Sequence, residues 1–442
     1  MLLLAFAPML PDLMHAPGAP LFSGPYLGPQ PTARNGEKPG APLQSHGGYP
    51  KAHAQNVPKA DSIQNAFAKG HFSLDARYRL HVVEEASKPF DATASTLRLR
   101  AGFRTAEFEG VSGYLELDHT EALGASKYNH ALDPRPGYPT IPDPKVTEMQ
   151  QAYLEVRELG GFEVRFGRMT PSLDDRRYLA PGSFRQNARS LDGLRVTNTG
   201  LKNLTLKYYY HWNFNLPLGD DHPAGDWNTD AHLLFAEYAG FKNARISSFG
   251  YLLKVKDDAP QSSQTFGMRL HGKAKLGAGA HALYEAQYAY QRDYANNPNN
   301  YAGVIFWASA GLQSGRFTAK IGYENLEGDG TNAVRFATGA RHRYQGLADQ
   351  FRAIPPEGLI DTYAHLTYRM PDMGFMKKPI LHLEYHDFEA QNTLDAYGTE
   401  WDVRYSFTAN RRLRFMLLYA GYRSQGFKSD LSSYVMQLTF NF

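Results

Sequence analysis

The sequence predicts an all-β protein, a transmembrane antiparallel β-barrel of about 18 strands. Apolar and polar residues alternate with a period of two in segments of roughly 10 residues along most of the chain. Short connections between these segments alternate with long ones, and the last segment ends the chain on an aromatic residue. No apolar run reaches the roughly 18 residues that a transmembrane helix needs. Together these features favour a barrel that is apolar outside and polar inside.

Composition excludes several classes of function. The 442 residues include no cysteine, so disulfides, thiolate metal sites and cysteine nucleophiles are excluded. A net charge of +3 is too small to indicate a nucleic-acid partner. The stretch at residues 277–282, GAGAHA, copies G-x-G-x-x-A, but the alternation after it predicts a strand instead of the required helix. We therefore predict a tight turn there, no cofactor and no enzymatic activity.

The N-terminal part differs in composition from the rest. Residues 1–54 are rich in Pro and Gly and are predicted to form a disordered leader or targeting segment. Residues 55–71 are predicted to be a short periplasmic segment, with a helix capped by Asp61. Residues 72–442 are predicted to form the barrel.

The first barrel strand, Ser73–Val82, has Leu74 and Tyr78 on one face and Arg77 and Arg79 on the other. Further strands are predicted at Thr96–Arg104, Phe162–Phe166, Leu204–Trp212, Phe266–His271, Leu381–His386 and Trp401–Phe407. Short turns are predicted at Glu107–Gly110, Leu159–Gly161, Gly240–Asn243, Leu276–His281, Gln313–Arg316 and Ala409–Arg412. Long connections are predicted at Glu84–Ser95, His119–Lys145, Met169–Ser190, Phe214–Asn228 and Leu326–Gly358. Short periplasmic turns and long external loops are typical of outer-membrane barrels.

The last strand, Ser432–Phe442, places Met436, Leu438 and Phe440 on an apolar face. In a soluble sheet it would be an exposed edge, whereas in a barrel it pairs with the first strand. The terminal Phe442 resembles the signal that the barrel assembly machinery reads, so this machinery is a predicted partner. Outer-membrane lipids are the other, contacted by aromatic girdles at strand ends. The predicted girdle residues are Tyr208, Tyr210, Trp212, Tyr288, Tyr290, Tyr385, Trp401, Tyr405, Tyr434 and Phe442.

Basic residues recur on the predicted lumen face. The predicted pore-lining residues are Arg77, Arg79, Arg98, Arg100, Arg104, Arg165, Arg195, Lys207, Lys320 and Arg404. Acidic residues on the same face are Glu116, Asp118, Glu155, Glu163, Glu324 and Asp402. Two interpretations stay open, which are a lumen with a basic and an acidic side, and a ladder of ion pairs that stiffens the barrel.

The third long connection and its flanks are rich in arginine. The predicted constriction-loop residues are Arg168, Arg176, Arg177, Arg185 and Arg189. If the loop folds inward, fixed guanidinium charges would lower the cost of dehydrating a carboxylate or phosphate. The alternative is an external loop held by pairs with Asp174, Asp175 and Asp192.

Two groups resemble metal ligands, but no metal site is predicted. His382, Glu384 and His386 share one strand face, where they are interpreted as lumen residues. Asp220, Asp221, His222, Asp226 and Asp230 could offer oxygens to calcium and are interpreted as turn formers.

Several stretches resemble the alginate export family of outer-membrane β-barrels. They are TLRLRAGFRTAEFEGVSGYLELDHTEALGASKYN from Thr96, VTEMQQAYLEV from Val146, FGRMTPSLDDRRYLAPGSFRQNARSLDGLRVTN from Phe166, PAGDWNTDAHLL from Pro223, QRDYANNP from Gln291, NLEGDGTNAVRFATGARHRYQGLADQF from Asn325 and YHDFEA from Tyr385. The resemblance implies an outer-membrane barrel of about 18 strands.

The predicted function is a porin-like channel in the outer membrane of a Gram-negative bacterium. It would pass a hydrophilic, anionic solute, with an acidic polysaccharide such as alginate as one version. The alternative is an outer-membrane enzyme or adhesin that uses the barrel as a scaffold and does not conduct.

Overall fold

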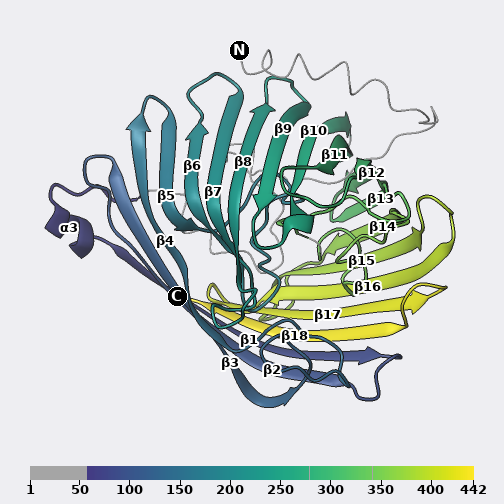
Figure 1. The fold of residues 1–442 in the computed structure, drawn as a ribbon. Helices are drawn as coiled ribbons and strands as arrows, with labels where there is room; N and C mark the ends of the chain where they lie inside the picture. Colours follow the sequence, from purple (N-terminus) through teal and green to yellow (C-terminus); the bar gives the residue numbers. More distant parts are fainter. Residues whose placement is uncertain (1–56, 278, 341) are drawn as a thin grey trace.

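The computed structural model describes residues 57–442, except 278 and 341. They form one closed antiparallel sheet of 18 strands, so the predicted fold class is confirmed (Figure 1). The barrel closes where β1 (His71–Glu85) pairs with β18 (Leu431–Asn441), in the register Asp75 to Asn441. The predicted leader, residues 1–54, lies outside the described residues.

The strands between these two follow one another around the barrel in chain order. They are β2 (Ala92–Arg104), β3 (Val111–Lys127), β4 (Val146–Leu159), β5 (Phe162–Met169), β6 (Ser190–Asn198), β7 (Leu204–Asn215), β8 (Asp226–Tyr238), β9 (Ala244–Val255), β10 (Ser263–Gly277), β11 (Ala280–Asp293), β12 (Ala302–Ser314), β13 (Phe317–Leu326), β14 (Leu359–Arg369), β15 (Lys377–Glu389), β16 (Ala396–Thr408) and β17 (Leu413–Ser424).

The alternation of side chains sorts each strand into an outer and a lumen face. In β18, Leu438 and Phe440 are 37% and 39% exposed on the outside, whereas Gln437 and Thr439 are buried. Phe442 continues the pairing beyond β18, since its backbone N–H donates to the carbonyl of Leu74 at 2.8 Å. The final strand therefore has no free edge.

Connections at one end of the barrel are short, as predicted. In the β10–β11 turn, Gly277 and Gly279 have φ angles of 104° and 76°, which glycine adopts without steric cost. A strand follows, so the G-x-G-x-x-A stretch is a hairpin turn. The β1–β2 connection, residues 86–91, is shorter than predicted because Val83 and Ala92 continue the buried face of their strands.

Within the described residues, one short α-helix precedes the barrel, α3 (Ile63–Ala68), and a 3-10 turn, η3 (Ala259–Gln261), lies between β9 and β10. The predicted cap of α3 is wrong by one residue. The hydroxyl of Ser62 accepts the backbone N–H of Asn65 at 3.2 Å, whereas the carboxylate of Asp61 accepts the side-chain amide of Asn65. No helix within residues 57–442 is long and apolar enough to span a membrane.

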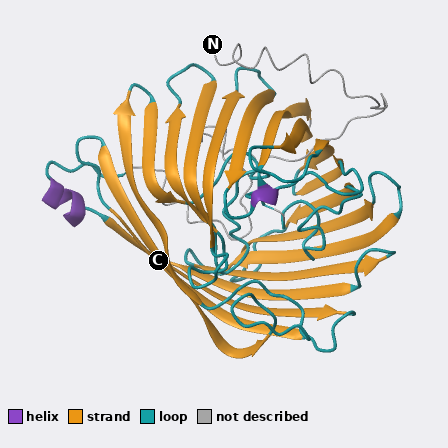
Figure 2. Cartoon of the chain, viewed as in Figure 1, coloured by secondary structure: helices purple, strands orange, loops and turns teal. Residues whose placement is uncertain are grey.

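Two connections are longer than the others. They are the β5–β6 loop, residues 170–189, and the β13–β14 loop, residues 327–358. Figure 2 shows long loops, drawn in teal, crossing the space that the strands enclose.

Candidate functional site

The β5–β6 loop lies inside the barrel, and none of its residues 170–189 is exposed. On one side, the guanidinium of Arg77 donates to the carbonyls of Ser183 and Arg185 at 3.2 and 3.1 Å. On the other side, the hydroxyl of Tyr209 in β7 donates to a loop carbonyl at 2.9 Å. The loop therefore spans the lumen between the β1 and β7 walls.

Apolar packing fixes the middle of the β5–β6 loop. The ring of Tyr178 lies 4.7 Å from Phe249 of β9 and 5.6 Å from Phe336 of the β13–β14 loop, measured between centroids. Leu173 and Leu179 belong to the same buried cluster. Part of the lumen is thus packed like the core of a soluble protein.

The two inward-folded loops are hydrogen-bonded to each other. The hydroxyl of Thr338 donates to the carbonyl of Tyr178 at 2.7 Å, and that of Tyr344 donates to the carbonyl of Asp175 at 2.6 Å. The backbone N–H of Ala180 donates to the carbonyl of Thr338 at 2.9 Å. The loops therefore form one layer across the barrel.

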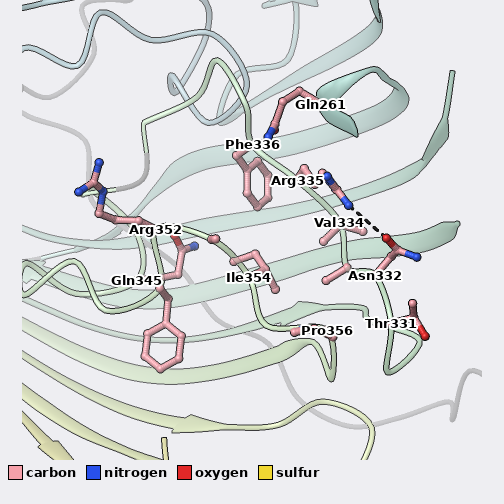
Figure 3. Close-up of a pocket in the computed structure, with 13 residues that line it drawn as sticks. Gln261, Thr331, Asn332, Val334, Arg335, Phe336, Gln345, Arg352, Ile354 and Pro356 are labelled. Carbon is pink, nitrogen blue, oxygen red and sulfur yellow. Dashed lines mark hydrogen bonds between the residues drawn. The ribbon is translucent and has the colours of Figure 1, made fainter. Parts of the chain in front are cut away.

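The β13–β14 loop is also attached to the wall. The backbone N–H groups of Leu347 and Ala348 donate to the carboxylates of Asp402 and Glu400 in β16, at 3.1 and 2.7 Å. Farther along, the loop lines most of a partly open cavity of about 270 Å³. Figure 3 shows the residues that line it, which include Gln261, Val334, Phe336, Arg352, Ile354 and Pro356.

Two of the predicted loop arginines anchor the loop through ion pairs. Arg177 pairs with Glu324 of β13, and its guanidinium lies 3.8 Å from the centroid of the Tyr344 ring. Arg185 pairs with Asp349 of the β13–β14 loop. Burial alone would raise the pKa of Asp349, but His342 and Arg185 outweigh burial and hold it well below its usual value.

The other predicted arginines of this group are placed differently. Arg176 donates to the hydroxyl of Ser172 at 3.1 Å, and Arg189 donates to the carbonyl of Gly339 at 2.7 Å. Arg168 lies in β5 and donates to both carboxylate oxygens of Asp192, at 2.7 and 2.9 Å. Its register places it on the outer face, two residues from the 58% exposed Phe166.

Most charged lumen residues of β1 to β6 form ion pairs between strands. The pairs are Arg98 with Asp75, Arg100 with Asp118, Arg104 with Glu155, Arg165 with Glu155, and Arg195 with Glu163. These contacts correspond to the ladder of ion pairs, and not to a lumen with one basic and one acidic side. Their contribution to conduction stays a prediction.

The remaining predicted pore-lining residues also lie on the lumen face. Arg79 is buried and donates to the carbonyl of Phe184 and to the side-chain oxygen of Gln437. The ammonium of Lys207 lies 5.7 Å from the ring centroid of Phe235. In the strand register, Lys320 is opposite His365, and Arg404 is opposite His382.

Sequence reasoning missed the role of Arg269 in β10. This arginine pairs with Glu285 and with Asp174 of the β5–β6 loop, the latter at 2.5 Å. Burial raises the pKa of Asp174 to about 6, against the opposing effect of Arg269. The strand Phe266–His271 was predicted, but neither the face of Arg269 nor its loop partner was.

One group of donors among the described residues could hold a metal ion, and it differs from the triplet His382, Glu384 and His386, which was interpreted as lumen residues without a metal. It contains His365 of β14 together with Glu384 and His386 of β15. His382 is not part of this group, and its ring nitrogen Nδ1 lies 3.0 Å from the hydroxyl of Thr367. The acidic residues from Asp220 to Asp230 form no such group within the described part of the chain.

No protein-family model and no curated protein sequence matches the chain. Solved structures do match it. OpdK from Pseudomonas aeruginosa, solved with vanillate, is 14% identical over 85% of this chain and 99% of its own, with a TM-score of 0.67. OpdO from the same organism is 13% identical over 86% of this chain and 98% of its own, with a TM-score of 0.67. OccAB4 from Acinetobacter baumannii is 9% identical over 84% of this chain and 98% of its own, with a TM-score of 0.68.

At these identities the likeness shows the fold. It is the closed 18-stranded antiparallel barrel of Gram-negative outer-membrane porins, and it fits an outer-membrane location. The resemblance to the alginate export family gains no support from these matches and stays a prediction.

Proposed function

We propose that the protein is a channel in the outer membrane of a Gram-negative bacterium and passes a hydrophilic, anionic solute. The observation that carries this proposal is the arginine-bearing β5–β6 loop folded inside a closed barrel of 18 strands. Barrels of this size are wide enough to hold an aqueous path beside such a loop. Guanidinium groups near that path favour anions over cations.

The size of the solute separates two versions of this proposal. An acidic polysaccharide such as alginate is what the family resemblance implies. The similar OpdK was solved with vanillate, a small carboxylate. The layer formed by the two inward loops favours a small solute, because a polymer would have to thread the same cross-section.

A non-conducting enzyme or adhesin is the second candidate, and single-channel recording separates it from the first. The detergent-purified barrel is added to a planar bilayer in KCl. Step-like conductance is expected, and silence from folded protein would overturn the channel proposal. Adding vanillate or alginate oligomers to the conducting protein then compares the two solutes, and the solute that passes is expected to interrupt the current.

The predicted partners belong to the same proposal. Phe442 is 59% exposed at the end of β18, and the guanidinium of Arg412 lies 4.6 Å from its ring centroid. If the assembly machinery reads this aromatic terminus, deleting Phe442 should keep the protein out of the outer membrane while synthesis continues. The deletion variant at its normal level in the outer membrane would refute this role.

A further inference from the structure

Three metal-ligating side chains converge on the lumen wall between β14 and β15. His365 is directly opposite Glu384 in the strand register, and His386 follows Glu384 by two residues on the same face. Their donor atoms all lie within 4.8 Å of one another. His365 Nε2 and the nearer oxygen of Glu384 are 3.6 Å apart.

A buried carboxylate orients His386. Nδ1 of this histidine lies 3.0 Å from each carboxylate oxygen of Asp361, which is itself fully buried. When the neutral ring donates its Nδ1–H to Asp361, Nε2 keeps its lone pair for another partner. A carboxylate behind a ligating histidine is the usual outer shell of a metal site.

Each of the two imidazoles has a ring nitrogen that could bind a metal ion. The Nε2 atoms of His365 and His386 are buried and have no hydrogen-bond partner. His386 is 1% exposed and its ring stacks on Phe388 at 5.4 Å between centroids. A buried polar atom without a partner is costly, and a ligand bound to these nitrogens would relieve that cost.

We propose that His365, Glu384 and His386 bind a divalent transition-metal ion such as Zn²⁺. Two imidazole nitrogens and one carboxylate oxygen suit Zn²⁺ better than Ca²⁺ or Mg²⁺, which prefer oxygen ligands. Bonds of about 2.0–2.1 Å to a tetrahedral ion place ligands roughly 3.4 Å apart, close to the separation between His365 and Glu384. Three protein ligands leave one position for water or a solute.

The electrostatic surroundings tolerate a cation. Lys320 and Arg404 lie near the three ligands and oppose it, but the carboxylates of Asp361 and Asp402 also face this region. The site is open on one side, because the side chains of His365 and Glu384 are 24% and 17% exposed. This inference does not depend on conduction by the barrel.

The test uses the full-length barrel in detergent, loaded with ZnCl₂, dialysed and assayed for zinc by elemental analysis. About one zinc per chain is expected. His386→Ala and His365→Ala should abolish retention, and Asp361→Asn should weaken the affinity about 10–100-fold through the lost orientation of His386. His382→Ala, on the same strand face, is the matched control and should bind as the wild type does.

Folding of each variant is checked by its heat-dependent mobility in gels. Co²⁺ gives a second readout on the wild type alone, since a tetrahedral site with two histidines produces visible absorption bands. Wild-type protein that retains no zinc and shows no Co²⁺ bands would overturn the proposal. Equal loss in His382→Ala and His386→Ala would instead assign the ion to the single-strand triplet and overturn the cross-strand site.

Discussion

Two walls of the lumen differ in what their inward side chains do. On β1 to β6 many of these side chains are charged and form ion pairs. Glu155 of β4 pairs with Arg104 of β2, with Arg165 of β5 and with Arg157 of its own strand. On β7 to β9 the buried inward residues are mostly apolar. They include Tyr209, Leu233, Phe235, Phe249, Tyr251 and Leu253.

The difference shows where the inward loops are held and by what. The β5–β6 loop packs its apolar residues on the β7–β9 wall, and its carbonyls accept hydrogen bonds from arginines of the charged wall. Apolar burial supplies non-directional stabilisation, whereas hydrogen bonds fix the position of the loop. Substitutions in the charged wall and in the apolar wall should therefore have different consequences.

The largest effect is expected in the charged wall. Glu155→Gln would leave the buried guanidinium groups around Glu155 without their main counter-charge, at a cost of about 3–5 kcal/mol. The matched control is Glu237→Gln on the other wall, where the carboxylate pairs with Arg245, whose side chain is 23% exposed, and where a smaller loss is expected. Urea unfolding in detergent, followed by gel mobility, measures both, and equal losses would contradict the ladder.

The next effect concerns the apolar wall. Phe249→Ala removes the ring on which Tyr178 packs and should cost about 3 kcal/mol of loop docking. Protease cleavage within the β5–β6 loop should become faster while the strands stay intact. The control Phe241→Ala affects a 54% exposed ring in the β8–β9 turn and should leave cleavage unchanged. A resistant Phe249→Ala loop would mean that hydrogen bonds alone hold it.

The outer and inner faces of β7 provide a comparison at adjacent residues. Leu206→Arg should destabilise the barrel by roughly 2–4 kcal/mol if this outward residue lies near the middle of the bilayer. Lys207→Ala, one residue on, should leave unfolding nearly unchanged and alter conductance. Similar unfolding of both variants in lipid vesicles would refute the assignment of the two faces.

A smaller effect is expected from pH. Burial lowers the pKa of His342 from its ordinary value of 6.5, so the docked loop prefers the neutral ring. Its contribution is full above pH 6.5 and is lost as pH falls through the lower pKa of the docked state. Asp349, whose pKa is also lowered, acts in the same direction below its ordinary value of 3.8. Loop cleavage should therefore rise on acidification, and a rise toward alkaline pH would contradict this sign.

The sequence predicted what depends on local periodicity. The alternation in Ser73–Val82 and Ser432–Phe442 correctly assigned faces, and the sorted connections supported 18 strands. It could not predict partners that depend on register or loop docking. His365 meets Glu384 only because β14 and β15 pair in one register, so the single-strand triplet was the only visible pattern. Likewise, Arg177 and Glu324 are 147 residues apart, and no local spacing joins them.

The sequence also did not predict that the lumen face of β7 to β9 is apolar. In β8 and β9 the inward residues are as apolar as the outward ones. The alternation of residues therefore no longer shows which face of the strand is in contact with water. Apolar residues such as Leu233 on a lumen face become intelligible only once Tyr178 and its neighbours are seen to cover them.

The most direct measurement is the zero-current potential of single channels in a KCl gradient. The wild type is expected to prefer anions, more so at low salt, where screening is weaker. Replacing Arg176, Arg177, Arg185 and Arg189 with Gln should shift the potential toward cation preference, while Arg168→Gln on the outer face should not. An unchanged potential in the folded four-residue variant would contradict the claim that the inward loop sets selectivity.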